Sequence, residues 1–349
     1  PEGYVKCITD EYEDYLQKNN PKRKSNAEFE AWIETKMSEY LNLQAVSSES
    51  GGIIYIPVVV HVIHNGDAYG TNENITDEQV ISQITVMNQD FRRMLGTPGY
   101  NTSPVGADVQ IEFVLAKVDP NGNPTNGINR VNLCQASWST AAINSIVKPT
   151  TIWNPDDYMN MWSVNFTDGG LLGYAQFPSA STLAGMPADG GAANTDGVVA
   201  GYRFFGSSAL APGSYSAPFD RGRTMTHEVG HYLGLRHIWG DGPCGTDDFC
   251  ADTPESDAPN YGCPTTHVSC STTDMVRNYM DYTDDTCMNI FTQNQKTRIL
   301  TVMTFSPRRA SLRTSTKDIA IPLFANDAEV KLETICTTIA CGTEAPAKQ

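Results

Sequence analysis

The sequence predicts a mixed α/β domain in which helices pack against a sheet of five strands. Five apolar or alternating stretches have strand character, at 53–64, 108–119, 158–166, 171–178 and 196–206. A long helical pattern separates the first two stretches and a histidine-rich helical pattern follows the last, an order typical of mixed α/β sheets. At 349 residues the chain is long enough for one main domain with smaller appendages.

Residues 1–50 form a segment of their own in the sequence pattern. Two charged helical stretches are joined by a basic turn, and apolar residues recur at helical spacing between Phe29 and Leu41. The Ser/Gly-rich break "SSESGG" at 47–52 then precedes the first strand. We therefore expect a helical N-terminal segment at 1–50 and a main domain at 51–315.

Two helices of the main domain have recognisable starts. Thr76, with Gln79 three residues later, has the pattern of a capping box before the first long helix, and Thr292 caps a closing helix. Between residue 243 and that closing helix, periodicity fades into Cys, Asp, Pro and Thr, which indicates a loop-rich C-terminal subdomain. The alternation from Asp318 onward predicts the start of a β-rich extension at 316–349.

Composition and charge exclude several classes of function. The net charge of −16 and the pI near 4.7 would repel a phosphate backbone, so we expect no nucleic-acid partner and favour basic peptides. No apolar run approaches the roughly 20 residues of a membrane span. Four of the nine cysteines lie within residues 244–270 without a C-x2-C pair, which favours disulfides in an exported protein over a zinc–thiolate cluster. The start at Pro1, without a basic and apolar leader, fits a secreted protein whose signal peptide has been removed.

The stretch "THEVGHYLGLRHIWGDG" at 226–242 crowds three of the six histidines of the chain into eleven positions. On a helix, His227 and His231 project from the same face one turn apart, a spacing that lets two imidazoles bind one metal ion. Glu228 lies beside the first histidine, where a carboxylate can take a proton from zinc-bound water, whose pKa falls to about 7. Gly234 permits the left-handed turn that ends the helix, and His237 can then return as the third ligand.

Three protein nitrogens leave one position of a tetrahedral zinc ion open for water and substrate, as a catalytic site requires. The alternative is a helix that carries histidines by chance. Five specified residue types in the frame H-E-x-x-H-x-x-G-x-x-H make that a rare accident. We therefore predict a catalytic zinc site with His227, His231 and His237 as ligands and Glu228 as general base.

Together with the later stretch "NYMDYTDDTCMNIFTQNQ", the motif "HEVGHYLGLRH" resembles the metzincin metallopeptidases, and specifically the pappalysin family, over roughly residues 50–305. The resemblance implies a metzincin-like catalytic domain with a twisted, mixed five-stranded sheet and an active-site helix at 221–235. It also implies a Met-turn at 278–282, in which Met280 packs beneath the zinc ligands. The Tyr282 hydroxyl would then lie near the metal and hydrogen-bond the developing oxyanion.

The same resemblance suggests how substrate and a second metal are bound. Asp285 is similar to an aspartate at the floor of the pocket for the side chain just after the scissile bond, where bidentate pairing would favour Arg over Lys. Its alternative is an exposed loop aspartate, and the neighbouring Asp284 competes for the role. The stretch at 171–178 would be the edge strand along which the substrate lies. A structural Ca²⁺ is implied in the loop at 245–256, unless that loop is merely a solvated acidic one, with the expected ligands Asp247, Asp248, Asp252 and Thr253.

The resemblance also implies disulfides between Cys244 and Cys270 and between Cys263 and Cys287. For the remaining pairs, Cys134 with Cys250 and Cys336 with Cys341 are candidates.

Cys7 is left over, and it resembles the cysteine of short pro-segments that close a metzincin site by placing a thiolate on the zinc. An intermolecular disulfide or an idle thiol is the alternative. In a latent chain of this kind, the basic turn with Lys22, Arg23 and Lys24 would offer a cleavage site.

The sequence therefore predicts a secreted zinc endopeptidase, latent through Cys7, that hydrolyses protein or peptide substrates on the N-terminal side of Arg or Lys. The alternative from another class is a calcium-stabilised binding or adhesion module with a vestigial zinc site. The intact Glu228 and Tyr282 count against that alternative. A third hypothesis keeps the enzyme but places it in another metzincin branch, which would change the specificity and leave the mechanism alone.

Overall fold

A seven-stranded mixed sheet forms the centre of the computed structural model, which describes residues 3–46, 52–179 and 192–322. The long central strand β2 (Ile54–His64) pairs on one side with β5 (Met159–Val164), and the sheet continues through β7 (Val198–Gly201) and β6 (Leu171–Ala175). All strand pairs of this sheet are parallel except β6 with β7, which is antiparallel, so the predicted mixed class is confirmed.

Two strands join the five that the sequence indicates. On its other side β2 pairs first with β3 (Ile111–Leu115) and then, further along the same edge, with β4 (Ile128–Asn132). The strand β1 (Val5–Cys7) comes from the N-terminal segment and pairs in parallel with β6. The polar sequence of β4 and the three-residue length of β1 give no periodic signal, because both strands lie at edges of the sheet where little apolar surface is buried.

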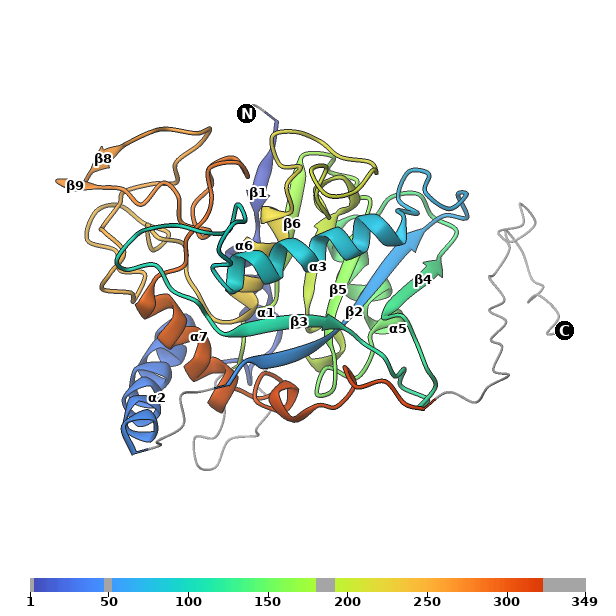
Figure 1. The fold of residues 1–349 in the computed structure, drawn as a ribbon, viewed down its shortest axis with the longest axis horizontal. Helices are drawn as coiled ribbons and strands as arrows, with labels where there is room; N and C mark the ends of the chain where they lie inside the picture. Colours follow the sequence, from blue (N-terminus) through green and yellow to red (C-terminus); the bar gives the residue numbers. More distant parts are fainter. Residues whose placement is uncertain (1–2, 47–51, 180–191, 323–349) are drawn as a thin grey trace, which may run out of the picture.

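Helices cover both faces of this sheet (Figure 1). On one face, α3 (Asp77–Phe91) and α6 (Arg223–Tyr232) contact each other and the strands, and together they enclose the main hydrophobic core. On the other face, α1 (Thr9–Asn19) and the helical turns of α4 (Thr140–Ala142), η1 (Ile143–Val147) and α5 (Lys148–Thr151) cover a second core around Trp162 and Tyr174.

The predicted helix starts are observed, with one difference. Thr76 accepts a hydrogen bond from the backbone N–H of Gln79 at 3.1 Å, but the Gln79 side chain donates to the carbonyls of Tyr202, Phe205 and Ser214 instead of closing a capping box. The box is complete at Thr292, which begins α7 (Gln293–Phe305). The side-chain amide of Gln79 thus fixes the chain that leads from β7 toward α6.

The N-terminal segment contains the two predicted helices, α1 and α2 (Asn26–Val46). The apolar side chains of Phe29, Trp32 and Ile33 pack with Val302 of α7, whereas Leu41 is exposed. Figure 1 shows α2 lying beside α7 at one end of the molecule, while β1 runs beside β6. The segment is therefore built into the fold at both places.

The loop-rich subdomain predicted after residue 243 is present, with one two-stranded ribbon. No strand forms between residues 316 and 322 of the described chain, and the rest of the predicted β-rich extension lies outside the described residues. Within the described parts, no helix combines the length and apolarity that crossing a membrane needs. The remaining short elements are η2 (Ala193–Thr195), η3 (Tyr202–Phe204), β8 (Val268–Ser269), β9 (Thr272–Thr273) and η4 (Ser311–Thr314).

Candidate metal centre and its surroundings

The helix α6 and the turn that follows it bring three histidines together. The helix spans 223–232 rather than the expected 221–235, because Gly222 precedes it and the chain turns at Gly234 with φ of +93°. The turn is closed by the Leu235 N–H, which donates to the Gly230 carbonyl at 3.0 Å. The Nε2 atom of His231 consequently lies 3.1 Å from Nε2 of His227 and 3.0 Å from Nε2 of His237.

The opposite ring nitrogens of the three histidines are held by oxygen atoms. Nδ1 of His227 donates to the Tyr279 carbonyl at 2.7 Å, and Nδ1 of His231 donates to the Leu235 carbonyl at 2.8 Å. Nδ1 of His237 lies 2.5 Å from a carboxylate oxygen of Asp241. With their protons on Nδ1, the three rings direct Nε2 lone pairs toward one point, which is the donor set that a zinc ion takes.

Met280 lies beneath this helix. It is buried, and its sulfur occupies the space beside Gly230, where a Cβ atom would overlap it. The Ile238 N–H donates to the Met280 carbonyl, which ties the turn at 278–282 to the strand of chain that carries His237. Gly230 therefore lets the methionine approach the helix closely on the side away from Glu228.

Glu228 is fully buried between α6 and the N-terminal segment. Its Oε2 accepts the Thr9 hydroxyl at 2.9 Å and lies 3.3 Å from the Cys7 sulfur, while its Oε1 has no hydrogen-bond partner in the described structure. Burial raises the pKa of Glu228 to about 8 when no metal is counted. Gly173 of β6 keeps this arrangement compact, because a Cβ atom there would press on Glu228 and on the Val199 carbonyl.

The Cys7 sulfur lies within the histidine cluster. The sulfur and one nitrogen from each of His227, His231 and His237 all lie within 4.8 Å of one another. The register of β1 on β6, with Cys7 opposite Gly173, places it there. Burial and the charge of Glu228 raise the pKa of the Cys7 thiol well above its usual value when no metal is counted.

Lys6, the residue before Cys7, is buried in the neighbourhood of Asp285. Its Nζ donates to the Thr283 carbonyl at 2.6 Å and lies 4.9 Å from the centre of the Phe219 ring. Burial lowers the pKa of Lys6, and the charge of Asp285 is the strongest influence that opposes this shift, ahead of Asp281 and Asp284. The buried ammonium group is therefore influenced by three aspartates, most strongly by Asp285.

Asp285 is buried rather than an exposed loop residue. Its Oδ2 accepts the backbone N–H groups of Arg221 at 2.8 Å and Arg223 at 3.2 Å, next to the start of α6. Its Oδ1 has no hydrogen-bond partner in the described chain. The residue thus anchors the beginning of the histidine helix with one oxygen and leaves the other to the pocket.

Tyr282 lies on the opposite side of the histidines from α6. Its ring is 5.0 Å from that of His237 and 5.6 Å from that of His227, measured between centroids, and it stacks edge-on to Trp239. Its hydroxyl lies 3.4 Å from the Cys7 carbonyl and donates to it. The structure therefore places Tyr282 within reach of the space that Cys7 fills.

The four residues expected to bind calcium do not form one converging set. Asp248 is buried and accepts the Thr253 hydroxyl at 2.7 Å, while Asp247 accepts the Phe249 N–H. Asp252 points away from them, because its Oδ2 accepts the Asn294 N–H in the first turn of α7. Burial raises the pKa of Asp248 to about 7. A cavity of about 260 Å³ adjoins this loop, lined among others by Asp247, Asp248, Thr253 and Glu255.

Both disulfides implied by the resemblance are present. Cys244 is joined to Cys270 and Cys263 to Cys287, which ties the irregular loop to the region of Tyr282 and Asp285. The suggested bond between Cys134 and Cys250 is wrong, because Cys134 is disulfide-bonded whereas Cys250 is a free, buried thiol. The suggested Cys336–Cys341 pair lies outside the described residues.

Several residues around the site were not predicted. Asp241 follows His237 by four positions, a spacing that could have signalled a carboxylate that accepts the Nδ1 proton of this histidine and orients its ring. Thr9, Lys6 and Asp10 gave no signal, because their contacts with Glu228, Asp285 and His237 join residues more than 200 positions apart. In the basic turn, Arg23 is buried in an ion pair with Glu13, whereas Lys22 is exposed.

Comparisons with known proteins agree with this geometry. The family described as Pregnancy-associated plasma protein-A matches residues 142–304. An extracellular metalloprotease of Arthroderma otae is 30% identical over 262 residues, which cover 74% of this chain and 81% of that protein. Mature mirolysin of Tannerella forsythia, solved in complex with a cleaved peptide, is 41% identical with a TM-score of 0.67, and the match covers 78% of this chain and 100% of that one. A promirolysin mutant of the same organism is 38% identical with a TM-score of 0.67, over 82% of this chain and 94% of its own.

Proposed function

This chain belongs to the pappalysin family of metzincins and is a zinc metalloendopeptidase, and from that premise we propose that it is a latent enzyme that cleaves before Arg or Lys. The observation that carries the proposal is the position of two consecutive residues of the N-terminal segment. Cys7 lies among the three histidines and Lys6 faces Asp285. One strand of the chain itself thus fills both the metal centre and the adjoining pocket.

In the open enzyme, His227, His231 and His237 would hold the zinc ion through Nε2. Bound zinc supplies Lewis acidity, which polarises the scissile carbonyl and makes water more acidic. Glu228 would take the proton from the attacking water and later pass it to the leaving amine. The Tyr282 hydroxyl, released from the Cys7 carbonyl, would donate a hydrogen bond to the developing oxyanion.

Latency would come from the N-terminal segment as a whole. β1 takes the free edge of β6, along which a substrate strand would otherwise pair. The Thr9 hydroxyl donates a hydrogen bond to the Glu228 carboxylate, and Cys7 lies where water and the substrate carbonyl would have to enter. A thiolate is a strong zinc ligand, so the metal would hold Cys7 in place of water.

The preference for basic residues would come from Asp285. The buried ammonium group of Lys6 supports this role, because Asp285 is the strongest charge acting on it and Thr283 accepts one of its hydrogen bonds. Because Asp285 keeps one oxygen without a hydrogen-bond partner in the described chain, a guanidinium group would find the same carboxylate. Asp285→Asn keeps an oxygen for the N–H groups of Arg221 and Arg223, so it should retain the fold and lower kcat/KM for Arg and Lys substrates at least about tenfold.

We also infer a bound calcium ion beside the loop at 245–256. Asp248 is buried without a positively charged partner in hydrogen-bond contact, and it lines the cavity together with Asp247, Thr253 and Glu255. A bound Ca²⁺ would offset the cost of burying this carboxylate. Millimolar calcium should raise the unfolding temperature of the chelated protein, and Asp248→Asn should remove most of that rise. An unchanged unfolding temperature would argue against the site.

Location outside the cell is part of the proposal. Relatives are named extracellular metalloproteases, and the two disulfides fit an oxidising compartment.

The test of the whole proposal uses the full chain, purified with its metal content measured. Before limited proteolysis it should be inactive, and afterwards it should cut a peptide library with Arg or Lys directly after the scissile bond, with activity lost to a zinc chelator. Cleavage without any basic preference would overturn the role of Asp285, and full activity of the uncut chain would overturn latency.

A further inference from the structure

We propose that, once the N-terminal segment has left, Arg236 and Arg298 form a second specificity site, which binds a carboxylate side chain of the substrate on the amino-terminal side of the scissile bond. This inference rests on the proposed function. It assigns a selective role to a pair of buried arginines that neither the metal centre nor the basic-residue pocket uses. The preferred substrates would be peptides that carry a glutamate some residues before the bond that is cut.

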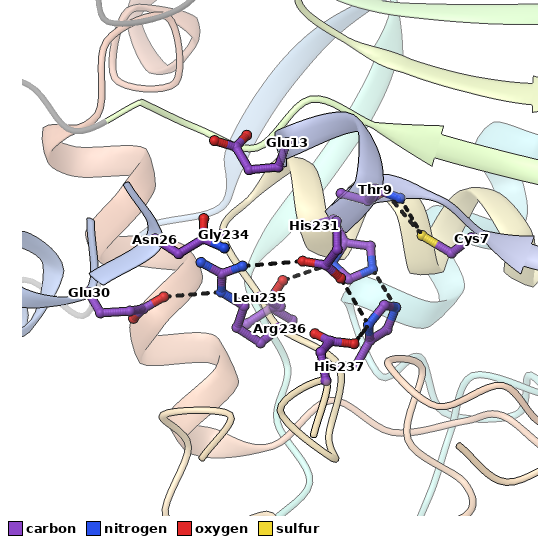
Figure 2. A network of polar contacts seen from close by, with 12 residues as sticks. Cys7, Thr9, Glu13, Asn26, Glu30, His231, Gly234, Leu235, Arg236 and His237 are labelled. Carbon is purple, nitrogen blue, oxygen red and sulfur yellow. Dashed lines mark hydrogen bonds and ion pairs between the residues drawn. The ribbon is translucent and has the colours of Figure 1, made fainter. Parts of the chain in front are cut away.

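Both arginines converge on one carboxylate of the N-terminal segment. Nη1 and Nη2 of Arg298 lie 2.7 Å and 2.8 Å from the two oxygens of Glu30, and Nε of Arg236 lies 3.1 Å from one of them. Nη1 of Arg236 also reaches Asp10 at 3.4 Å. Figure 2 shows Arg236 between Glu30 and the histidines. A doubly held carboxylate is the strongest common form of anion recognition in proteins.

Contacts with the catalytic domain also hold the two arginines in place. Nε of Arg298 donates to the Gly234 carbonyl at 2.6 Å, in the turn that ends the histidine helix. The guanidinium group of Arg236 lies 4.6 Å from the ring centre of Phe177. These contacts do not involve residues 1–50, so the two groups should keep their positions after activation.

Departure of the segment would leave two cations without partners. Among the described residues, every ion pair of Arg236 and Arg298 is made with Asp10 or Glu30. Asp248, the catalytic-domain carboxylate that also influences Arg298, accepts hydrogen bonds from Thr253 and from the Cys250 N–H instead. Two neighbouring guanidinium groups in a partly enclosed surface favour a carboxylate that replaces Glu30.

The order of contacts along β6 tells on which side of the scissile bond the site lies. Val5 is opposite Leu171, Cys7 is opposite Gly173, and the Thr9 hydroxyl accepts the Ala175 N–H. Lys6 with Asp285 therefore lies on one side of the histidines, while Asp10 and Glu30 lie on the other. Since the Asp285 pocket would take the residue after the scissile bond, the arginine pair faces the residues before it.

The overall negative charge of the protein bears on how such a site would select acidic substrates. Residues 1–50 contain 10 acidic and 6 basic side chains, so the chain without them keeps a net charge of −12 and repels acidic peptides at long range. A preference for glutamate can therefore come only from local contacts. The two arginines lie next to the metal centre. Arg236 directly precedes His237 in the sequence, and Arg298 donates a hydrogen bond to the carbonyl of Gly234. A substrate carboxylate held there would lie close to the reacting bond.

The experiment compares matched peptides on the enzyme obtained from the full chain by limited proteolysis. Each peptide has Arg after the scissile bond, and glutamate or glutamine stands at one of the positions two to six residues before it. We expect one position at which glutamate lowers KM about fivefold to tenfold with little change in kcat. Arg236→Gln should abolish this difference, and Arg236→Glu should favour lysine at the same position. Arg203→Gln, an exposed arginine elsewhere on the catalytic domain, should leave the difference unchanged.

The outcomes separate this inference from the proposed function. Cleavage before Arg with equal KM for glutamate and glutamine at all five positions would overturn the arginine site and leave the proposed function standing. Absence of cleavage before Arg in every peptide would instead overturn the proposed function. A glutamate preference that survives in Arg236→Gln and does not reverse in Arg236→Glu would also overturn the inference, because another group would then bind the carboxylate.

Discussion

Glu228 is one of several buried carboxyl groups of the molecule whose surroundings favour the neutral form. In the closed chain it is buried beside the Cys7 thiol and the Thr9 hydroxyl, and burial raises its pKa to about 8. Removing these two neighbours opens the carboxylate to water, so that the group can act as a base. The N-terminal segment therefore covers the metal centre and also holds the general base in a hydrogen bond with the Thr9 hydroxyl.

The first prediction concerns this carboxylate. Glu228→Gln keeps the shape of the side chain but cannot take a proton, so kcat of the activated enzyme should fall at least about a hundredfold. Zinc content, measured by metal analysis, should stay unchanged, because the three histidine nitrogens do not depend on the carboxylate. Activity within a few-fold of the parent enzyme would show that another group serves as the base.

The second prediction concerns Cys7. Cys7→Ser removes the thiol from the histidine cluster, so the uncut chain should gain measurable activity, roughly tenfold or more above the parent. Cys250→Ser is the matched control, since Cys250 is the other buried free thiol of the described chain and belongs to the acidic loop instead. Equal residual activity in both variants would mean that the bulk of the segment, not the thiol, maintains latency.

The predictable part of the site is the part that one helix and one turn determine. The spacing of His227, His231 and Gly234 leads directly to converging nitrogens, because helix geometry and the left-handed turn at Gly234 follow from local sequence. The position of Lys6 near Asp285 depends on a strand pairing between residues 166 positions apart, Val5 with Leu171. Such long-range pairings leave no pattern in the local sequence. Only the folded structure shows that Asp285, more than Asp284, acts on Lys6.

At the scale of elements, strands with a local sequence pattern were predictable and strands without one were not. The five strands with apolar alternation were predictable, since each buries a face in one of the two cores. β4 was not, because Ile128 is its only fully buried residue, and β1 was not, because it becomes a strand only where β6 offers an edge. An edge strand takes its extended conformation because a neighbouring strand pairs with it. Its own sequence therefore gives little sign of that conformation.

The third prediction concerns the packing of α2 on α7. Ile33 is 1% exposed and contacts the cluster around Val302, so Ile33→Ala should weaken the docking of the segment by about 2–5 kcal/mol. The segment should then leave more often, and limited proteolysis should activate the chain faster than it activates the parent. The rate is followed by gel and by peptide hydrolysis.

Leu41→Ala is the control for this prediction, since Leu41 lies on the same helix and is 54% exposed. Its activation rate should match that of the parent. If Ile33→Ala activates no faster than Leu41→Ala, the apolar contact of α2 with α7 does not contribute to latency, and the ion pairs of Glu30 and the strand β1 must hold the segment.

At the scale of the whole molecule, buried ion pairs join parts that are far apart in sequence. Glu30 binds Arg298 across 268 positions and holds the segment, whereas Asp196 binds Arg308 and Arg309 and holds the catalytic domain together. The second cluster links the entry of β7 with the chain after α7, so it should outlast activation. Its stability must depend on pH, because one carboxylate balances two guanidinium groups in a dry environment.

The last prediction follows from the pKa of Asp196. Burial alone would raise it, but Arg309 and Arg308 outweigh burial and lower the pKa from 3.8 to about 2. The unfolded chain therefore binds this proton more readily, so stability rises with pH through this range. The contribution of about 2 kcal/mol should be complete above about pH 5, and about 1 kcal/mol of it should be lost by pH 3.

Urea unfolding of the activated enzyme at pH 6 and pH 3 measures this loss. Asp196→Asn should be less stable at pH 6, and its further loss on going to pH 3 should be smaller than that of the parent by about 1 kcal/mol, because the titrating group is gone. Asp168→Asn, at an exposed position, should reproduce the pH dependence of the parent. If Asp196→Asn loses as much stability between the two pH values as the parent does, the two arginines do not depress the pKa of this carboxylate. The acid sensitivity of the fold would then have to be assigned to other carboxylates with a lowered pKa, beginning with Asp274, where hydrogen bonds from His267 and Ser269 outweigh the effect of burial.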